Sequence, residues 1–183
     1  LALLNTYDTV IFYNHDRVIT GGEQTALEAY VQNGGFLIVT GYDSLGSPTD
    51  ATLAALVRSG TSGDGPFSGD VTIEDDTLPA TNGPYGVIDA GTDWTPSRTD
   101  HDQASPLTSE TFSVASVSTR SKLLYTPSIG AGSGTIYYWN GNGSTGSSAF
   151  TDWTTDGVGQ QMFLNIMNES CRGRVSWTGA DMF

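Results

Sequence analysis

The sequence predicts a single α/β domain spanning residues 1–183, with three layers: a mostly parallel sheet, helices on both of its faces, and some antiparallel edge strands. Three observations predict this fold. A strand, helix, strand unit opens the chain, two aromatic strands flank a glycine-rich turn late in the chain, and an amphipathic helix closes it. A hydrophobic content of 37% is enough for one core in a chain of this length.

The opening unit is marked by local signals. The β-branched and aromatic run 7–13 has the composition and length of a strand. Thr20 and Glu23 have the spacing of a capping box, which predicts that a helix begins there. The run 33–35, Asn-Gly-Gly, contains residues that accept the left-handed conformation and therefore predicts the end of that helix. The nearly continuous apolar run 36–40 predicts a strand covered on both faces.

Later elements follow from periodicity and turn signals. Asp50 is placed to cap a short helix. The segment 112–117 alternates with period two, which indicates an exposed or edge strand. The segments 122–125 and 135–139 predict adjacent strands of a hairpin. Residues 159–171 predict the closing helix, whose buried stripe comprises Met162, Phe163, Ile166 and Met167.

Several motifs occur in an order that is similar to a known superfamily. They are Tyr7-Asp8 before a strand, Glu23-Gln24 opening a helix that ends in the run 30–35, the proline-bearing segment 78–84, the run 134–141, and Asn165 in the closing helix. In this order they resemble the class I glutamine amidotransferase-like superfamily, and within it the trehalose-utilisation-like (ThuA-like) and related non-catalytic bacterial domains. The resemblance covers most of the chain and implies flavodoxin-like layering.

Two departures from that pattern matter. Catalytic amidotransferases carry a cysteine on a tight turn after a strand, and this chain has no cysteine there. Its one cysteine, Cys171, falls late in the amphipathic helix, where we expect inert packing. The superfamily also begins with a strand and helix ahead of Tyr7, so this element is either missing or replaced by the segment 174–177.

A ligand site is expected where the first two strands end, because open parallel sheets place their ligands at the carboxyl ends of the strands. The candidates there are Asn14, His15, Asp16, Tyr42, Asp43 and Ser44. An alternative gives three of them catalytic roles, with Ser44 as nucleophile and His15 and Asp43 beside it. Residues 44–46 match half of a nucleophile-elbow signature, but Tyr42 stands where its first glycine belongs.

Metal and sugar sites are weaker hypotheses. Asp100, His101 and Asp102 combine imidazole and carboxylates, yet sequence neighbours point apart and a polar loop is the simpler interpretation. No cofactor is expected, although calcium is a hypothesis resting on the carboxylates of Asp64, Asp70, Glu74, Asp75 and Asp76, whose spacing matches no EF-hand. Tryptophans beside loops can stack on sugars, but covering the core edge is the favoured role for Trp94, Trp139 and Trp153.

Charge and composition limit the partners. A formal net charge of −13 with only 7 Lys and Arg argues against binding to nucleic acid. No apolar run approaches the roughly 20 residues that cross a bilayer, so membrane insertion is not expected. The acidic, lysine-poor composition suits an extracellular or periplasmic bacterial protein, and a start without Met suits a piece of a longer chain.

From these observations the sequence predicts a non-catalytic, amidotransferase-like binding or assembly module of a secreted bacterial protein. Its partner is an unidentified ligand or protein, and a homo-oligomer is a further hypothesis. The alternative is a hydrolase or carbohydrate-modifying enzyme that uses Ser44 and His15 with metal assistance.

Overall fold

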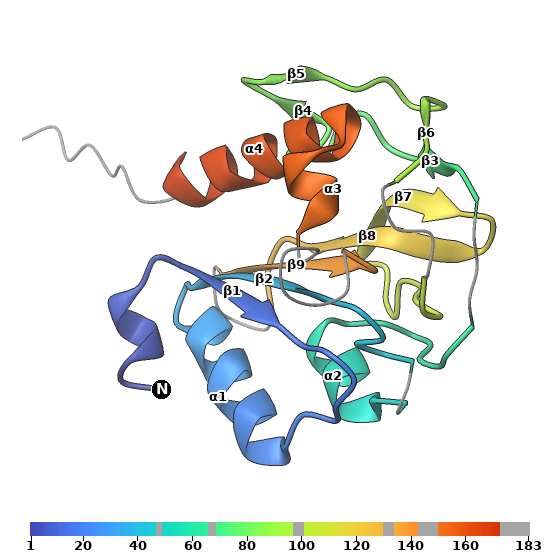
Figure 1. Cartoon of the computed structure of the whole chain (residues 1–183). Helices are drawn as coiled ribbons and strands as arrows, with labels where there is room; N and C mark the ends of the chain where they lie inside the picture. Colours follow the sequence, from blue (N-terminus) through green and yellow to red (C-terminus); the bar gives the residue numbers. More distant parts are fainter. Residues whose placement is uncertain (47–48, 66–68, 97–100, 130–133, 143–149, 173–183) are drawn as a thin grey trace, which may run out of the picture.

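The computed structural model describes residues 1–46, 49–65, 69–96, 101–129, 134–142 and 150–172. A seven-stranded sheet runs through the domain, with helices on both of its faces (Figure 1). Its strands, in spatial order, are β1 (Thr9–Tyr13), β2 (Phe36–Gly41), β9 (Thr135–Asn140), β8 (Arg120–Thr126), β7 (Phe112–Val117), β3 (Val71–Ile73) and β6 (Asp93–Trp94). A separate pair consists of β4 (Asn82–Gly83) and β5 (Gly86–Val87).

Two layers of helix cover this sheet. On one face lie α1 (Gly21–Gln32) and α2 (Ala51–Leu56), and on the other lie α3 (Thr151–Thr154) and α4 (Gly157–Arg172), as Figure 1 shows. A single 3-10 turn, η1 (Leu4–Thr6), precedes β1. The predicted α/β class with helices on both faces is therefore present.

The predicted mostly parallel sheet is wrong, because the sheet is largely antiparallel. Among the described strands, only the pairings of β1 with β2 and of β2 with β9 are parallel. The pairings β9–β8, β8–β7, β7–β3 and β3–β6 are all antiparallel. For β7 and β8 the reason is the length of the connection, because residues 118–119 alone join them and parallel strands need a crossover of a dozen or more residues.

The opening unit forms as the local signals predict. Thr20 Oγ1 accepts a hydrogen bond from Glu23 N at 3.2 Å, and Glu23 Oε2 accepts one from Thr20 N at 2.8 Å, which completes the capping box. The helix ends at Gln32, and Gly34 follows with a φ of 93°, a conformation that glycine adopts without strain. Every residue of β2 is buried, as its apolar run predicts. Asp50 also caps α2, accepting from Leu53 N at 2.8 Å.

The core lies on both faces of the central strands, because successive side chains alternate across a sheet. Leu37 and Val39 of β2 face α1 and α2 together with Tyr138 of β9. Ile38 of β2 and Tyr137 of β9 face the opposite way, toward α4. All five are fully buried, and each contributes roughly 1.5–3 kcal/mol by leaving water.

The three tryptophans belong to the core on the α4 side. Trp94, Trp139 and Trp153 are 5%, 0% and 6% exposed. The Trp139 ring lies 6.1 Å from the Trp94 ring and 5.7 Å from the Trp153 ring, and Trp153 stacks on Phe163 at 4.2 Å. These rings therefore pack on one another, as the favoured interpretation expects, and are not open platforms for a sugar.

Other outcomes concern the later elements. The hairpin of β8 and β9 and the stripe of α4 are confirmed. The segment 112–117 is not an edge strand, since β7 lies between β8 and β3; its alternation reflects one face packed on the core. The predicted packing of Cys171 is wrong as well, because its side chain is exposed near the end of α4.

Two predictions fall outside the described residues: Asp100 of the weak metal motif and the segment 174–177 as a replacement strand. Within the described part of the chain, the helices are too short or too polar to cross a membrane.

Candidate functional site

Three strand ends meet at one edge of the sheet. Because β1, β2 and β9 are parallel, their carboxyl ends point the same way. The residues that follow hold the ends together: Asn14 N donates to Thr40 O at 2.8 Å, and Asn142 N donates to Gly41 O at 3.3 Å. Gly41 is required for this convergence, because a Cβ there would lie 1.6 Å from the carbonyl oxygen of Asn14. We call this region the carboxyl edge.

The predicted ligand residues all lie at the carboxyl edge, but they differ in exposure. Asn14 and Ser44 are fully buried, whereas the side chain of His15 is 25% exposed. The His15 ring lies 5.6 Å from the Tyr42 ring, and His15 Nδ1 lies 3.1 Å from a carboxylate oxygen of Asp16. The structure thus groups His15 with Tyr42 and Asp16 at the rim.

Ser44 is held apart from that group. Its hydroxyl is 2.8 Å from the hydroxyl of Tyr138, and both residues are fully buried. Burial raises the pKa of Tyr138 well above its ordinary value, so this hydroxyl stays protonated and does not serve as a base. Within the described residues no hydrogen bond joins Ser44 to His15.

Two buried amides at the carboxyl edge keep hydrogen-bonding capacity. Asn14 Nδ2 donates to Arg17 O at 2.9 Å, and Asn142 Oδ1 accepts from Asp152 N at 3.1 Å. The other atom of each amide, Asn14 Oδ1 and Asn142 Nδ2, is buried without a partner among the described residues. Buried polar atoms are rarely left unpaired, and one acceptor and one donor are available here.

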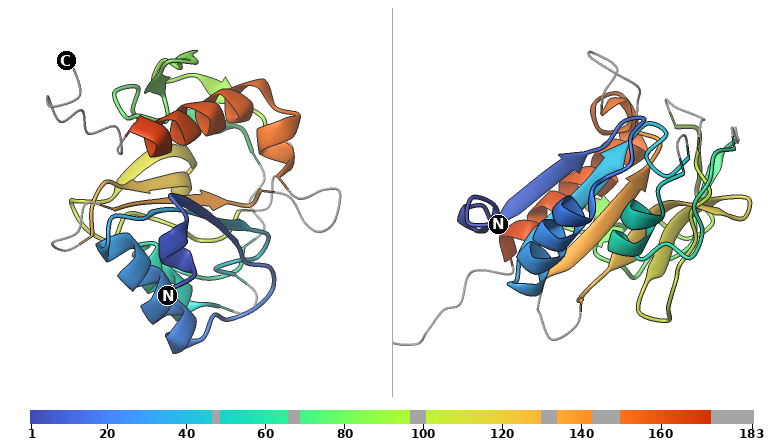
Figure 2. Two further views of the ribbon diagram at one scale, coloured as in Figure 1. Left: turned by 90° about the vertical axis from the view of Figure 1, so that its left-hand side faces the viewer. Right: turned by 90° about the horizontal axis from the view of Figure 1, so that it is seen from below.

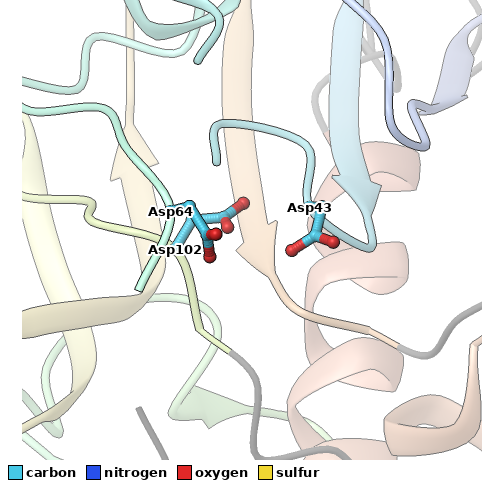
Figure 3. A group of neighbouring side chains, drawn as sticks. All are labelled: Asp43, Asp64 and Asp102. Carbon is cyan, nitrogen blue, oxygen red and sulfur yellow. The ribbon is translucent and has the colours of Figure 1, made fainter. Parts of the chain in front are cut away.

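Three carboxylates also come together beside this edge. Asp43 follows β2, and Asp64 and Asp102 come from two loops distant in sequence (Figure 3). One carboxylate oxygen of each lies within 4.8 Å of the other two. Asp43 is half-buried, Asp64 is exposed and Asp102 is 3% exposed. Such oxygen donors are those that calcium and magnesium take, although carboxylates also cluster without a cation.

Asp102 is fixed by the main chain of Leu45 and by the side-chain amide of Asn140. Leu45 N donates to Asp102 Oδ2 at 2.8 Å, and Asp102 N donates to Asn140 Oδ1 at 3.1 Å. Asn140 Nδ2 donates back to Asp102 O at 2.9 Å. His101 beside it is fully buried, so residues 101 and 102 lie in a loop, as the sequence favours, but one that is packed into the domain.

A buried ion pair supports the carboxyl edge, and sequence reasoning missed it. Lys122 Nζ lies 2.7 Å from Asp152 Oδ2 and donates to Asn140 O at 2.6 Å and Gly141 O at 3.1 Å. Lys122 and Asp152 are both 0% exposed. Desolvation lowers the pKa of Lys122, and the neighbouring carboxylate of Asp152 opposes that effect. Trp139 Nε1 donates to the same carboxylate oxygen at 3.0 Å.

A sequence signal for this pair did exist. Lys122 stands directly before the apolar run Leu123-Leu124-Tyr125, in a strand predicted to be part of the sheet. A charged residue inside a buried strand needs a partner of opposite charge, which makes a lysine in this position informative. The partner could be identified only from the fold, because Asp152 lies in α3, about thirty residues after Lys122 in the chain.

No family model matches the chain, and no curated protein is similar to it in sequence.

Solved structures do share the fold. The cytoplasmic protein STM3548 from Salmonella typhimurium is similar at 14% identity with a TM-score of 0.62, over 92% of this chain and 73% of that one. The mmIFT52 N-terminal domain is similar at 13% identity with a TM-score of 0.60, over 95% of this chain and 81% of that one. The β-galactosidase from Rahnella sp. R3 is similar at 13% identity and 0.53, over 90% of this chain but 23% of that one. At such identities the likeness concerns the fold alone.

Proposed function

We propose that this domain is a non-catalytic, amidotransferase-like binding or assembly module of a secreted bacterial protein, and that its ligand contacts the carboxyl edge. The single observation that carries the proposal is the state of Ser44. Its hydroxyl, the one candidate nucleophile at this edge, is fully buried and engaged by Tyr138. A serine nucleophile needs access to substrate and a base within hydrogen-bond reach.

Binding groups remain available where catalytic groups do not. The buried atoms Asn14 Oδ1 and Asn142 Nδ2 offer an acceptor and a donor that the described residues do not use. Both atoms are as buried as the hydroxyl of Ser44, so the partly exposed groups at the rim make the first contact with a ligand. His15 and Tyr42 form the aromatic rim of the same edge. These groups suit the recognition of a small polar molecule.

The similar structures support the proposal that this domain is one module of a longer protein. One is the N-terminal domain of a larger protein, and the β-galactosidase is matched over 23% of its length. A fold that recurs as one part of longer chains fits a domain that works within a larger protein. Secretion is proposed from the acidic, lysine-poor composition.

The test is thermal unfolding of the purified chain against calcium, zinc and simple sugars, with and without a chelator. A ligand present at 100 times its Kd adds about 2.7 kcal/mol of stability, which raises the Tm of a domain of this size by roughly 5–11 °C. We expect one class of ligand to produce such a shift. His15→Ala and Tyr42→Ala at the rim should abolish it, whereas Tyr85→Ala, at an exposed aromatic residue beside β5, should retain it as the control.

The outcomes separate the two functions. A shift lost with the edge variants and unaccompanied by turnover supports a binding module. A ligand that stabilises all four proteins equally binds elsewhere and contradicts the assignment to the carboxyl edge. Turnover of an ester or glycoside that requires Ser44 establishes the alternative, a hydrolase or carbohydrate-modifying enzyme.

A further inference from the structure

The two edge strands of the main sheet differ in their protection. Sheet edges invite pairing with other chains, and proteins blunt them with charge, proline, bulges or short length. At one edge, β6 is two residues long and carries Asp93, which accepts a hydrogen bond from Thr72 Oγ1 at 2.6 Å. At the other edge, β1 has five residues, Thr9-Val10-Ile11-Phe12-Tyr13, with neither charge nor proline.

The outer side of β1 presents main-chain groups in a regular order. Phe36 N donates to Asp8 O at 3.2 Å and Asn14 N donates to Thr40 O at 2.8 Å, so residues 8 and 14 point toward β2. Since strand residues alternate, residues 10 and 12 also point toward β2, and the N–H and C=O groups of Thr9 and Ile11 point away from it. Among the described residues no strand pairs with this outer side, and Figure 2 shows β1 as the outermost strand.

Exposed apolar side chains occur in β1 and just before it in the chain. Ile11 is 42% exposed, whereas Val10 and Phe12 on the opposite face are partly buried against the α1 layer. Just before β1 in the chain, Leu3 is 69% and Tyr7 is 55% exposed. An exposed apolar side chain such as Ile11 beside open main-chain groups favours pairing with another chain.

We propose that β1 pairs antiparallel with β1 of a second copy of this chain, so that the two sheets join across a two-fold axis. The inference concerns a different part of the molecule from the carboxyl edge and does not depend on the proposed function. Pairing centred on Ile11 places Ile11 opposite Ile11 of the second copy, Val10 opposite its Phe12, and Thr9 opposite its Tyr13. All three are β-branched or aromatic combinations that stabilise neighbouring strands.

The register also satisfies geometry and charge. The outward groups of Ile11 face their own counterparts across the axis, which forms a hydrogen-bonded pair of the antiparallel ladder. Asp8 is placed opposite Asn14 of the second copy, so no like charges oppose each other directly. A second copy is thus complementary to β1, and the contact is isologous and closes after two chains.

Analytical ultracentrifugation of the 183-residue chain tests the proposal. We expect a concentration-dependent equilibrium between a 19.3 kDa monomer and a dimer. Because each copy carries a net charge of −13, the dimer fraction should rise when added NaCl screens the repulsion. A wild-type chain that remains monomeric at about 200 µM in 0.5 M NaCl overturns the proposal.

Charge variants test the register. Ile11→Lys should weaken dimerisation by at least about tenfold, because two lysines then meet at the axis. Val87→Lys is the matched control, since Val87 is a 56% exposed apolar residue of β5 outside the main sheet, and it should dimerise like wild type. Unchanged circular dichroism and Tm would show that both variants fold.

A mixture gives the most specific result. Ile11→Lys and Ile11→Glu should each be monomeric alone, and an equal mixture of the two should form a heterodimer because opposite charges meet at the axis. The pairing of β1 would be refuted if Ile11→Lys alone dimerised with the wild-type Kd, or if the mixture stayed monomeric. Either result would place any association on another surface.

Discussion

The buried ion pair beneath the carboxyl edge allows a quantitative prediction. Lys122 Nζ meets three acceptors: a carboxylate oxygen of Asp152 at 2.7 Å and the carbonyl oxygens of Asn140 and Gly141 at 2.6 and 3.1 Å. Three acceptors match the three N–H donors of an ammonium group. Lys122→Met removes these contacts and leaves a buried carboxylate without its cation.

The expected cost follows from that geometry. Removing one member of a buried ion pair typically costs about 3–5 kcal/mol, because the remaining charge stays buried without compensation. For a domain of this size the loss corresponds to a fall in Tm of roughly 6–20 °C. Asp152→Asn should cost a similar amount, since it leaves the ammonium of Lys122 in the same surroundings.

The double variant distinguishes this account from simple loss of packing. With Lys122→Met and Asp152→Asn together, neither charge remains, and the cost should fall well below the sum of the single costs. Urea unfolding followed by tryptophan fluorescence measures all four proteins. The coupling would be contradicted if the two single losses of unfolding free energy added up to the loss in the double variant to within about 0.5 kcal/mol. A loss of less than about 1 kcal/mol in Lys122→Met would also contradict it.

Three further predictions concern the framework of the site. Hydrogen bonding from Arg17 is the main cause that lowers the pKa of Glu23 from 4.5 to about 2. Glu23 therefore stabilises the fold above pH 4.5 and loses that effect as the pH falls toward 2. The difference in unfolding free energy between wild type and Glu23→Gln, measured by urea unfolding at each pH, should shrink between pH 4.5 and 2 and stay constant above pH 4.5. Ser44→Ala should cost about 1–3 kcal/mol, because the hydroxyl of Tyr138 is left buried without this partner, and an unchanged unfolding midpoint would contradict the contact. Gly41→Ala should cost more than about 2 kcal/mol, since its Cβ meets a main-chain oxygen at 1.6 Å, and a variant with the wild-type Tm would show that the strand ends are looser than described.

Local elements were predictable from the sequence because their signals are local. The capping box of Thr20 and Glu23 and the apolar run of β2 depend on neighbours a few residues away. Strand direction was predictable for the hairpin of β8 and β9, but an apolar run without an evident turn has the same pattern in a parallel and an antiparallel sheet. The two-residue connection 118–119 contained the information that β7 and β8 are antiparallel, but only once both strand ends were known.

The candidate site was predictable in part for the same reason. Its first half, from Asn14 to Asp16 and from Tyr42 to Ser44, follows from the parallel pairing of β1 with β2. The second half was missed because β9 lies beside β2, a neighbour about a hundred residues away in the chain. That pairing brings Asn142 and the ion pair of Lys122 to the carboxyl edge.

The carboxylate group shows the same limit. Asp43, Asp64 and Asp102 were each candidates from the sequence, but for three separate reasons: a catalytic role, calcium binding and a weak metal motif. Their convergence within 4.8 Å depends on loops that pack against one another. Residue type therefore indicated the chemistry, and only the tertiary fold could assemble the group.

Turnover is the most direct test of the central claim that this domain binds without catalysis. Chromogenic acyl esters and glycosides would be incubated with wild type, Ser44→Ala and His15→Ala, and with calcium and zinc added in separate series. We expect the same background rate for all three proteins, because the hydroxyl of Ser44 is buried against Tyr138. A wild-type rate at least about a hundredfold above background that both variants abolish would contradict the account, since general-base catalysis contributes about that factor or more.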